Sequence, residues 1–356
     1  MQPTLSLSAP DASAGSDSHA RRQVAAWLLV CCALVFAMVV VGGVTRLTRS
    51  GLSIVEWQPL MGAIPPLSEA HWQELFDKYR QTPEYLQVNR GMSLHEFKGI
   101  FWWEYIHRLL GRLIGLAFFV PLLWFIVRRK LERALVPRLV AIFLLGGLQG
   151  AIGWWMVKSG LISDPRVSHV RLSIHLGLAF LIFAAMFWTA LGLLARHSTR
   201  DPRRRRLAGY GAVLSAVTFV MVLSGGLVAG TRAGYAYNTF PLMNGRFFPS
   251  EYFMLQPWWD NFLHNMATVQ FNHRLIAWLL LLVIPAFWWA LRRAAAPPQA
   301  RLASNLLLAM LALQLALGIG TLLLGVPVAL GAMHQAGAMV LFALLLWTTH
   351  SVGRET

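Results

Sequence analysis

Eight long apolar runs constrain the fold of this chain more than any other feature. Each is long enough to cross the hydrocarbon core of a bilayer as a helix, which takes about 20 apolar residues. The runs lie near residues 24–45, 102–127, 138–157, 169–194, 207–229, 270–291, 302–324 and 328–349. The composition agrees, since 56% of the 356 residues are hydrophobic and 13% are charged. We therefore expect an all-α polytopic membrane protein with eight transmembrane helices.

Basic residues gather on one side of these spans. The N-terminal tail, the loops 128–138, 195–206 and 292–301, and the C-terminus hold 17 Lys or Arg against 5 Asp or Glu. Short loops rich in Lys and Arg stay in the cytoplasm, so we expect cytoplasmic termini. A bacterial inner membrane location is expected because the N-terminal tail, with no Lys or Arg in its first 20 residues, does not resemble a transit peptide. Topology thus explains the net charge of +16 without a nucleic acid partner. Anionic membrane lipid is the contact expected for the basic loops.

The N-terminal tail and the two cysteines carry no catalytic signal. Residues 1–22 are rich in Ser and Ala and predict a disordered cytoplasmic tail, not a secretory signal or a transit peptide. Cys31 and Cys32 are adjacent inside the first span. We interpret them as core residues without a disulfide or metal role.

The two halves of the sequence repeat each other. The pattern GG-x4-TR-x-G begins at Gly42 and again at Gly225, and a His-Arg pair, a Gln and a second His follow in the same order. We infer two tandem four-helix bundles related by a pseudo-two-fold axis along the membrane normal. The expected organisation is a first half over 23–195 with a long outer loop at 46–101, a basic linker at 196–206 and a second half over 207–350.

Four histidines fall at one depth of the predicted bundle. His107 and His175 belong to the first half, and His273 and His334 to the second. Each lies a few residues inside the outer end of its span, about 6–10 Å deep at 1.5 Å per residue. A single such histidine is more often a packed residue bonded to a neighbouring carbonyl. Two matched pairs instead favour axial ligation of one haem per half, since zinc would want further Cys or carboxylate ligands.

Four arginines accompany these histidines. Arg49 and Arg232 end the first and fifth spans, and Arg108 and Arg274 directly follow a histidine. A guanidinium binds a carboxylate in a bidentate way, so these residues are candidates for the haem propionates. The alternative is that they reach toward lipid headgroups. We interpret Gln149 and Gln314, which also repeat, as interhelical hydrogen bonders.

The halves differ at one acidic position of the outer loops. Glu56 aligns with Thr239, and the first outer loop is the longer one. A carboxylate held near the haem edge could accept a proton or stabilise a developing cation, whereas the alternative is an ordinary surface glutamate. We infer that the first half performs chemistry and that the second half holds a permanent cofactor.

These motifs carry a family resemblance over nearly the whole chain from about residue 22. The run TRSGLSIVEWQP at 48–59, with EYIHR at 104–108, NHRL at 272–275 and HQ at 334–335, resembles the Cox15/CtaA family of haem A synthases. The resemblance implies a two-step oxidation of the C8 methyl of haem O to the formyl group of haem A, with an essential glutamate at Glu56. It implies haem B as cofactor on His273 and His334. Haem O as substrate would then lie between His107 and His175.

The resemblance is to the branch with a long first outer loop. The Bacillus-type branch carries a cysteine pair in an outer loop, whereas both cysteines of this chain lie in the first span, so a thiol-based step does not carry over. The active site is expected toward the periplasmic side, with haem O synthase and cytochrome c oxidase assembly factors as partners. The redox partner, the source of the formyl oxygen and the oligomeric state, a homo-oligomer included, stay open. The rival interpretation is a dihaem b-type electron-transfer cytochrome or a haem carrier, which would share the histidines but has no need for Glu56.

Overall fold

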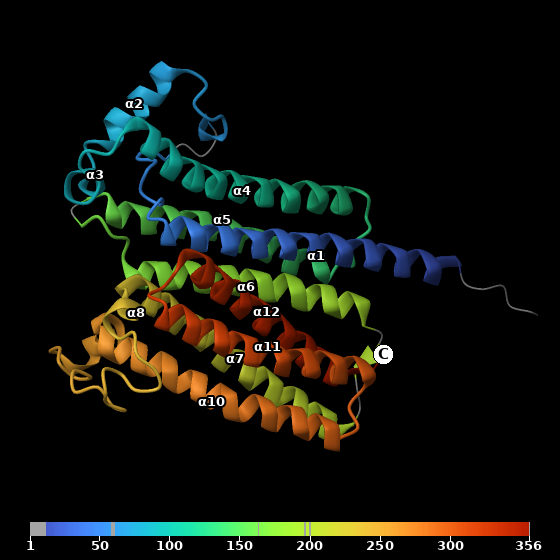
Figure 1. Ribbon diagram of the computed structural model, residues 1–356. Helices are drawn as coiled ribbons and strands as arrows, with labels where there is room; N and C mark the ends of the chain where they lie inside the picture. The colour runs from blue at the N-terminus through green and yellow to red at the C-terminus, as the bar shows by residue number, and fades with distance from the viewer. Residues whose placement is uncertain (1–11, 58–60, 163, 196, 199–200, 356) are drawn as a thin grey trace, which may run out of the picture.

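The computed structural model describes residues 12–57, 61–162, 164–195, 197–198 and 201–355. Within this part of the chain, eight helices are long and apolar enough to span a membrane, which confirms the predicted multi-pass membrane protein. They are α1 (Ala12–Leu47), α4 (Leu94–Val127), α5 (Leu135–Gly160), α6 (His169–Leu194), α7 (Pro202–Thr231), α10 (Met266–Arg293), α11 (Pro298–Leu323) and α12 (Val328–Val352). The eight run side by side, with the start of α1 and the end of α12 at the same end of the bundle (Figure 1). We call this the termini end and the opposite one the loop end.

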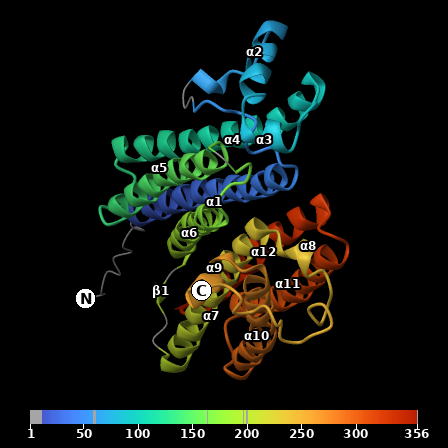
Figure 2. The same cartoon turned by 90° about the vertical axis from the view of Figure 1, so that its left-hand side faces the viewer.

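The helices of the two halves pack in the same order. In the first half α1 contacts α4 and α6, and α5 lies between α4 and α6. In the second half α7 contacts α10 and α12, and α11 lies between α10 and α12. Figure 2 shows the two groups one above the other. They meet where α6 contacts α7 and where α12 contacts α1 and α6. This shared order is what an internal repeat would produce, and the symmetry axis itself stays a prediction.

Small residues and hydrogen bonds bring the halves together at this seam. A Cβ on Gly226 of α7 would lie 3.0 Å from the Cα of Ser173 on α6, so only glycine allows this approach without a shift. The Ser173 hydroxyl donates to the carbonyl of Leu223 at 2.7 Å. Gln335 of α12 donates to the carbonyl of Val39 on α1 at 2.7 Å. The seam therefore includes polar contacts as well as apolar packing.

The first outer loop folds into a small unit at the loop end. It contains η1 (Met61–Ala63), α2 (Glu69–Tyr79) and α3 (Pro83–Gln87), and α2 stands out from the side of the bundle next to the start of α4 (Figures 1 and 2). The Ser68 and Thr82 side chains cap α2 and α3. An aromatic cluster fastens the unit to α4, and its members are Trp72, Phe76, Tyr79, Tyr85, Phe97, Phe101 and Tyr105. The matching loop of the second half contains α8 (Ala233–Ala236), η2 (Trp258–Asp260) and α9 (Asn261–His264).

The start of α1 corrects the predicted N-terminal tail. α1 begins at Ala12, so residues 12–22 are helical where a disordered tail was predicted, and residues 1–11 lie outside the described part. Helix elongation from an established span is favourable, and Arg21 adds an ion pair to Glu132 at 3.1 Å.

The predicted linker is also partly structured. Residue 196 and residues 199–200 lie outside the described part, but Pro202 already begins α7 and the Asp201 side chain caps it. The linker also contains β1 (His197–Ser198), which pairs antiparallel with β2 (Arg354–Glu355) near the C-terminus. Apart from this two-residue ladder and one isolated bridge between Met243 and Arg246, the described secondary structure is helical.

Candidate functional site

The two predicted histidine pairs lie in the interior of the two halves near the loop end. His107 of α4 and His175 of α6 lie within electrostatic range of each other. The same holds for His273 of α10 and His334 of α12. All four side chains are half-buried. The structure thus brings together the residues that the sequence paired.

In the first half each imidazole rests against a glycine of a neighbouring helix. A Cβ on Gly42 of α1 would lie 2.9 Å from Nε2 of His107. A Cβ on Gly153 of α5 would lie 2.9 Å from Cε1 of His175. Real Cβ atoms essentially never approach another heavy atom so closely. Any larger residue at either position would therefore displace the imidazole.

The second half repeats this arrangement. A Cβ on Gly225 of α7 would lie 3.3 Å from Cε1 of His273, and a Cβ on Gly318 of α11 would lie 2.8 Å from Cε1 of His334. The Ser224 hydroxyl lies 2.8 Å from Nδ1 of His273. A hydrogen bond at one imidazole nitrogen fixes the ring and leaves the other nitrogen for a metal.

The repeated glutamines hold the second histidine of each pair through its backbone. Gln149 Nε2 donates to the carbonyl of His175 at 3.0 Å, and Gln314 Nε2 donates to the carbonyl of His334 at 2.9 Å. This confirms their predicted role as interhelical hydrogen bonders. In the described chain, Nδ1 of both histidines and Oε1 of both glutamines are buried without a hydrogen-bond partner. Buried polar atoms of this kind usually have a hydrogen-bond partner, which a ligand or a water molecule would supply.

These features fit a flat macrocycle held between two imidazoles. The glycines let each imidazole pack closely against a neighbouring helix, and one histidine in each half keeps a buried nitrogen without a hydrogen-bond partner in the described part of the chain. Among the described residues, no group of three or more His, Cys, Asp or Glu is placed to hold a metal ion. Each histidine pair offers two imidazoles, which is the number that axial ligation of a haem requires.

Arg108, a predicted propionate ligand, is hydrogen-bonded to the protein itself. Its Nε and Nη2 donate to Oε1 of Glu104 at 3.1 and 2.7 Å. Nη2 also donates to the carbonyl of Ile54 at 2.9 Å, and Nη1 to the carbonyl of Glu56 at 3.1 Å. The other oxygen of Glu104 accepts from the Ser53 hydroxyl at 2.7 Å and from the amide of Ile54 at 2.9 Å. Arg108 and Glu104 thus clamp the backbone of the first outer loop.

A similar clamp exists in the second half, but without the carboxylate. Arg274 Nη2 donates to the carbonyl of Tyr237 at 2.9 Å, and so does Gln270 Nε2 at 2.9 Å. In the alignment of the halves, Tyr237 matches Ile54 and Gln270 matches Glu104. Both arginines therefore bind the same position of their loops, and the acid is confined to the first half.

Glu56 and Glu104 occupy contrasting environments. The Glu56 side chain is 43% exposed and forms an ion pair with Lys78 of α2 at 2.7 Å. Glu56 and then Glu74 raise the pKa of Lys78 to about 12. The Glu104 side chain is 3% exposed and lies three residues before His107, one helical turn away. Glu104 was not among the residues predicted from the sequence. The repeat does show the difference between the halves, since EYIHR in one half corresponds to QFNHR at 270–274 in the other.

Arg49 and Arg232 share an unusual backbone conformation. Their φ angles are +54° and +59°, a left-handed region that costs energy for any residue except glycine. The two guanidinium groups lie within electrostatic range, and Arg46 also lies near Arg232. Burial, followed by the charge of Arg49, lowers the pKa of Arg232. Other residues that follow helix ends, such as Arg129 and Ala295, adopt the same conformation. What distinguishes Arg49 and Arg232 is that one comes from each half and the two lie near each other.

Comparison with known proteins identifies the family. The sequence profile of COX15-CtaA, described as cytochrome oxidase assembly protein, matches residues 25–346. The chain belongs to this family. A heme A synthase of Nitrosospira multiformis is 61% identical over 337 residues, which cover 94% of this chain and 95% of the relative. A heme A synthase of Nitrosomonas eutropha is 55% identical over 350 residues, with 98% of each chain covered.

The COX15-CtaA match includes every residue of the site. It contains both histidine pairs, the four arginines, Glu56 and Glu104. The resemblance that the short motifs predicted is therefore confirmed over 322 residues, from 25 to 346. The roles of the individual residues remain proposals.

Proposed function

We propose that this chain is a haem A synthase, which oxidises the C8 methyl group of haem O to the formyl group of haem A. The relatives that bear this name align with nearly its full length. The observation that carries the proposal is the asymmetry between the halves. Both contain a histidine pair in a glycine-lined setting, but the first half alone has a buried carboxylate one turn before its first histidine.

The two halves would hold different haems. We assign haem O, the substrate, to His107 and His175, and haem B, the resident cofactor, to His273 and His334. When bound, haem B supplies one-electron transfer. The chain contributes the paired imidazoles, the glycines that admit a macrocycle, and the Ser224 contact that orients His273.

The oxidation of a methyl to a formyl group breaks two C–H bonds and forms a bond to oxygen, so a group that can accept or donate a proton near the substrate would assist it. Glu56 was the sequence candidate, but its side chain is turned to Lys78 at the surface. Glu104 lies closer to His107 in the helix, is buried, and connects to the Glu56 backbone through Arg108. We therefore propose Glu104 as the group that holds or moves the proton, with Glu56 as the second candidate.

Arg49 and Arg232 are proposed to bind propionates. Both lie at the loop end in a strained conformation, close to the seam. Arg108 and Arg274 are assigned instead to holding the outer loops, because their guanidinium groups donate to loop carbonyls. We further propose an inner-membrane orientation with the loop end toward the periplasm, where oxidase assembly factors would receive the product, and with haem O synthase as the supplier of substrate.

Analysis of extracted haems tests the proposal. A strain without its own haem A synthase would express the wild type, Glu104→Gln or Glu56→Gln, and chromatography would separate haems B, O and A. We expect haem A from the wild type. We expect haem O to accumulate in Glu104→Gln, with haem B still bound to the protein. Glu69→Gln, which changes an exposed acid of the same loop, is the matched control and should behave as wild type.

The outcomes separate the proposal from its rival. A wild type that yields no haem A would favour the dihaem cytochrome or haem carrier. Normal haem A from Glu104→Gln together with loss in Glu56→Gln would return the catalytic role to Glu56. Normal production from both variants would show that neither carboxylate performs the proton transfer.

A further inference from the structure

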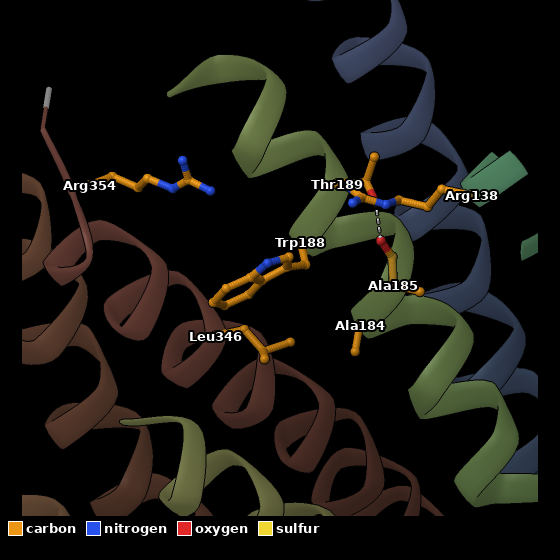
Figure 3. Close-up of a pocket in the computed structure, with 7 residues that line it drawn as sticks. All are labelled: Arg138, Ala184, Ala185, Trp188, Thr189, Leu346 and Arg354. Carbon is orange, nitrogen blue, oxygen red and sulfur yellow. Dashed lines mark hydrogen bonds between the residues drawn. The ribbon is translucent and has the colours of Figure 1, made fainter. Parts of the chain in front are cut away.

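A pocket lies on the seam between the two halves at the termini end of the bundle. Figure 3 shows the side chains that line it. Its volume is about 570 Å³, within the range of small-ligand sites. It is lined by Arg138, Ala184, Ala185, Trp188, Thr189, Leu346 and Arg354. Trp188 lies 13 residues beyond His175 on α6, about 20 Å along the helix axis. The pocket is therefore separate from the proposed haem sites.

The polar side of this pocket is cationic. Arg138 lies in the first turn of α5 and Arg354 follows α12, so one guanidinium comes from each half. The lining contains no carboxylate, and within the described residues neither guanidinium has a hydrogen bond or an acidic partner. The Thr189 hydroxyl is already used, since it donates to the carbonyl of Ala185 at 2.7 Å. The pocket thus presents two guanidinium groups, whose geometry matches carboxylate or phosphate oxygens.

Arg354 is held in place by the surrounding backbone. It pairs with Ser198 in the β1–β2 ladder. Arg204 of α7 donates to the carbonyl of Arg354 at 2.5 Å and to that of Val352 at 3.2 Å. The C-terminal segment is therefore fixed beside the pocket, and its position does not depend on the Arg354 side chain.

The remaining wall is apolar and belongs to the spans. Ala184, Ala185 and Trp188 come from α6 and Leu346 from α12. Trp188 is 39% exposed, and its ring packs edge-on against His350 at 5.0 Å. A water-soluble anion would contact the two arginines but not the apolar wall. A molecule with an anionic head and an apolar chain would use both.

We propose that this pocket binds an anionic phospholipid. Its anionic headgroup lies in the pocket, where Arg138 and Arg354 stand on opposite sides (Figure 3), and an acyl chain lies against the α6–α12 wall. Basic pockets between transmembrane helices bind anionic headgroups in this way. The bound lipid joins α5 of the first half to the C-terminal segment of the second. This site goes beyond the haem chemistry and does not depend on it.

Native mass spectrometry of the full-length protein tests the proposal, with phosphatidylglycerol or phosphatidylcholine added in mild detergent. We expect phosphatidylglycerol to bind more tightly than phosphatidylcholine. Each of Arg138→Gln and Arg354→Gln should weaken phosphatidylglycerol about fivefold, and the double variant about 30-fold, with phosphatidylcholine unchanged. Ala185→Leu, which fills the pocket and keeps both charges, should also weaken phosphatidylglycerol.

Arg133→Gln and Arg293→Gln remove exposed arginines of the same end that do not line the pocket. They should stay within about twofold of wild type, by the same charge argument. The proposal is overturned if these controls weaken binding as much as the pocket variants, or if the wild type binds both lipids equally. Full displacement of phosphatidylglycerol by inorganic phosphate would instead indicate a site for a free anion. Loss of bound haem from the pocket variants, with phosphatidylglycerol affinity unchanged, would assign the arginines to haem.

Discussion

Glu84 should make the stability of the first outer loop depend on pH. This residue of α3 is 4% exposed and accepts a hydrogen bond from the Tyr79 hydroxyl at 3.2 Å. Burial raises the pKa of its carboxyl from 4.5 to about 7, the negative charge of Glu104 adds to the rise, and the Tyr79 bond and Arg49 oppose it. Between these two pH values the folded loop holds a proton that the unfolded loop releases.

The sign and size of the effect follow from proton linkage. Because the folded state binds more protons between pH 4.5 and 7, the free energy of unfolding of the loop falls as pH rises through this window. At 1.36 kcal/mol per pKa unit, the difference between the two ends of the window is about 3 kcal/mol. Below pH 4.5 and above pH 7 the titration of Glu84 causes no further change in the free energy of unfolding of the loop. The loop also includes α2, whose Lys78 forms the ion pair with Glu56. The titration of Glu84 should therefore also affect the surroundings of the Glu56 side chain.

Hydrogen–deuterium exchange of peptides from 69–92 measures this directly, after correction for the intrinsic pH dependence of exchange. We expect protection to decrease from pH 5 to pH 8 in the wild type. Glu84→Gln keeps the shape and removes the charge, so its protection should be nearly independent of pH and exceed that of the wild type at pH 8. A wild-type loop with constant protection, or a Glu84→Gln loop with the same pH dependence as wild type, would refute the reasoning.

Three further variants test the site. Gly318→Val places side-chain atoms against His334; the haem B content of the purified protein should fall, and a wild-type content would contradict the proposed packing. Arg232→Gly relieves a left-handed conformation that costs about 1 kcal/mol or more, so thermal unfolding should occur no earlier than in wild type while haem is retained less well; retention equal to wild type would exclude a propionate role. Glu104→Ala should lower the unfolding free energy by about 3–5 kcal/mol, because Arg108 is left half-buried without its carboxylate; a change below about 1 kcal/mol, within the range of surface ion pairs, would show that the clamp does not hold the loop.

The sequence was sufficient for the spans and for the histidine pairs. Length and apolarity alone identify a membrane helix, so all eight were predicted to within about five residues except at the starts of α1 and α4, which begin earlier. The histidines could be paired because the repeat places equivalent residues on equivalent helices. Their glycine contacts were less accessible, because each glycine touches a histidine of a different helix and such contacts depend on how the helices pack.

The parts that sequence analysis missed depend on long-range contacts. Arg108 follows a histidine, which suggested a propionate, but the chain itself supplies a carboxylate and two carbonyls that satisfy its guanidinium. In the alignment of the two halves, Glu56 is matched by Thr239, which is not acidic. Lys78 lies 22 residues after Glu56 and forms an ion pair with its side chain at the surface. The aromatic cluster that folds the first outer loop joins α2 and α3 to α4 and has no local periodic signature. Such pairings are set by tertiary packing, which composition and spacing do not specify.

The haem content of the purified protein tests the two-site account most directly, when wild type is compared with His273→Ala and with His107→Ala. We predict that wild type carries haem B together with haem O or haem A. His273→Ala should lose haem B, and His107→Ala should keep haem B and lose the O- and A-type haems. Loss of haem B from His107→Ala with its retention in His273→Ala, or the same haem composition in all three proteins, would contradict the assignment of cofactor and substrate to the two halves.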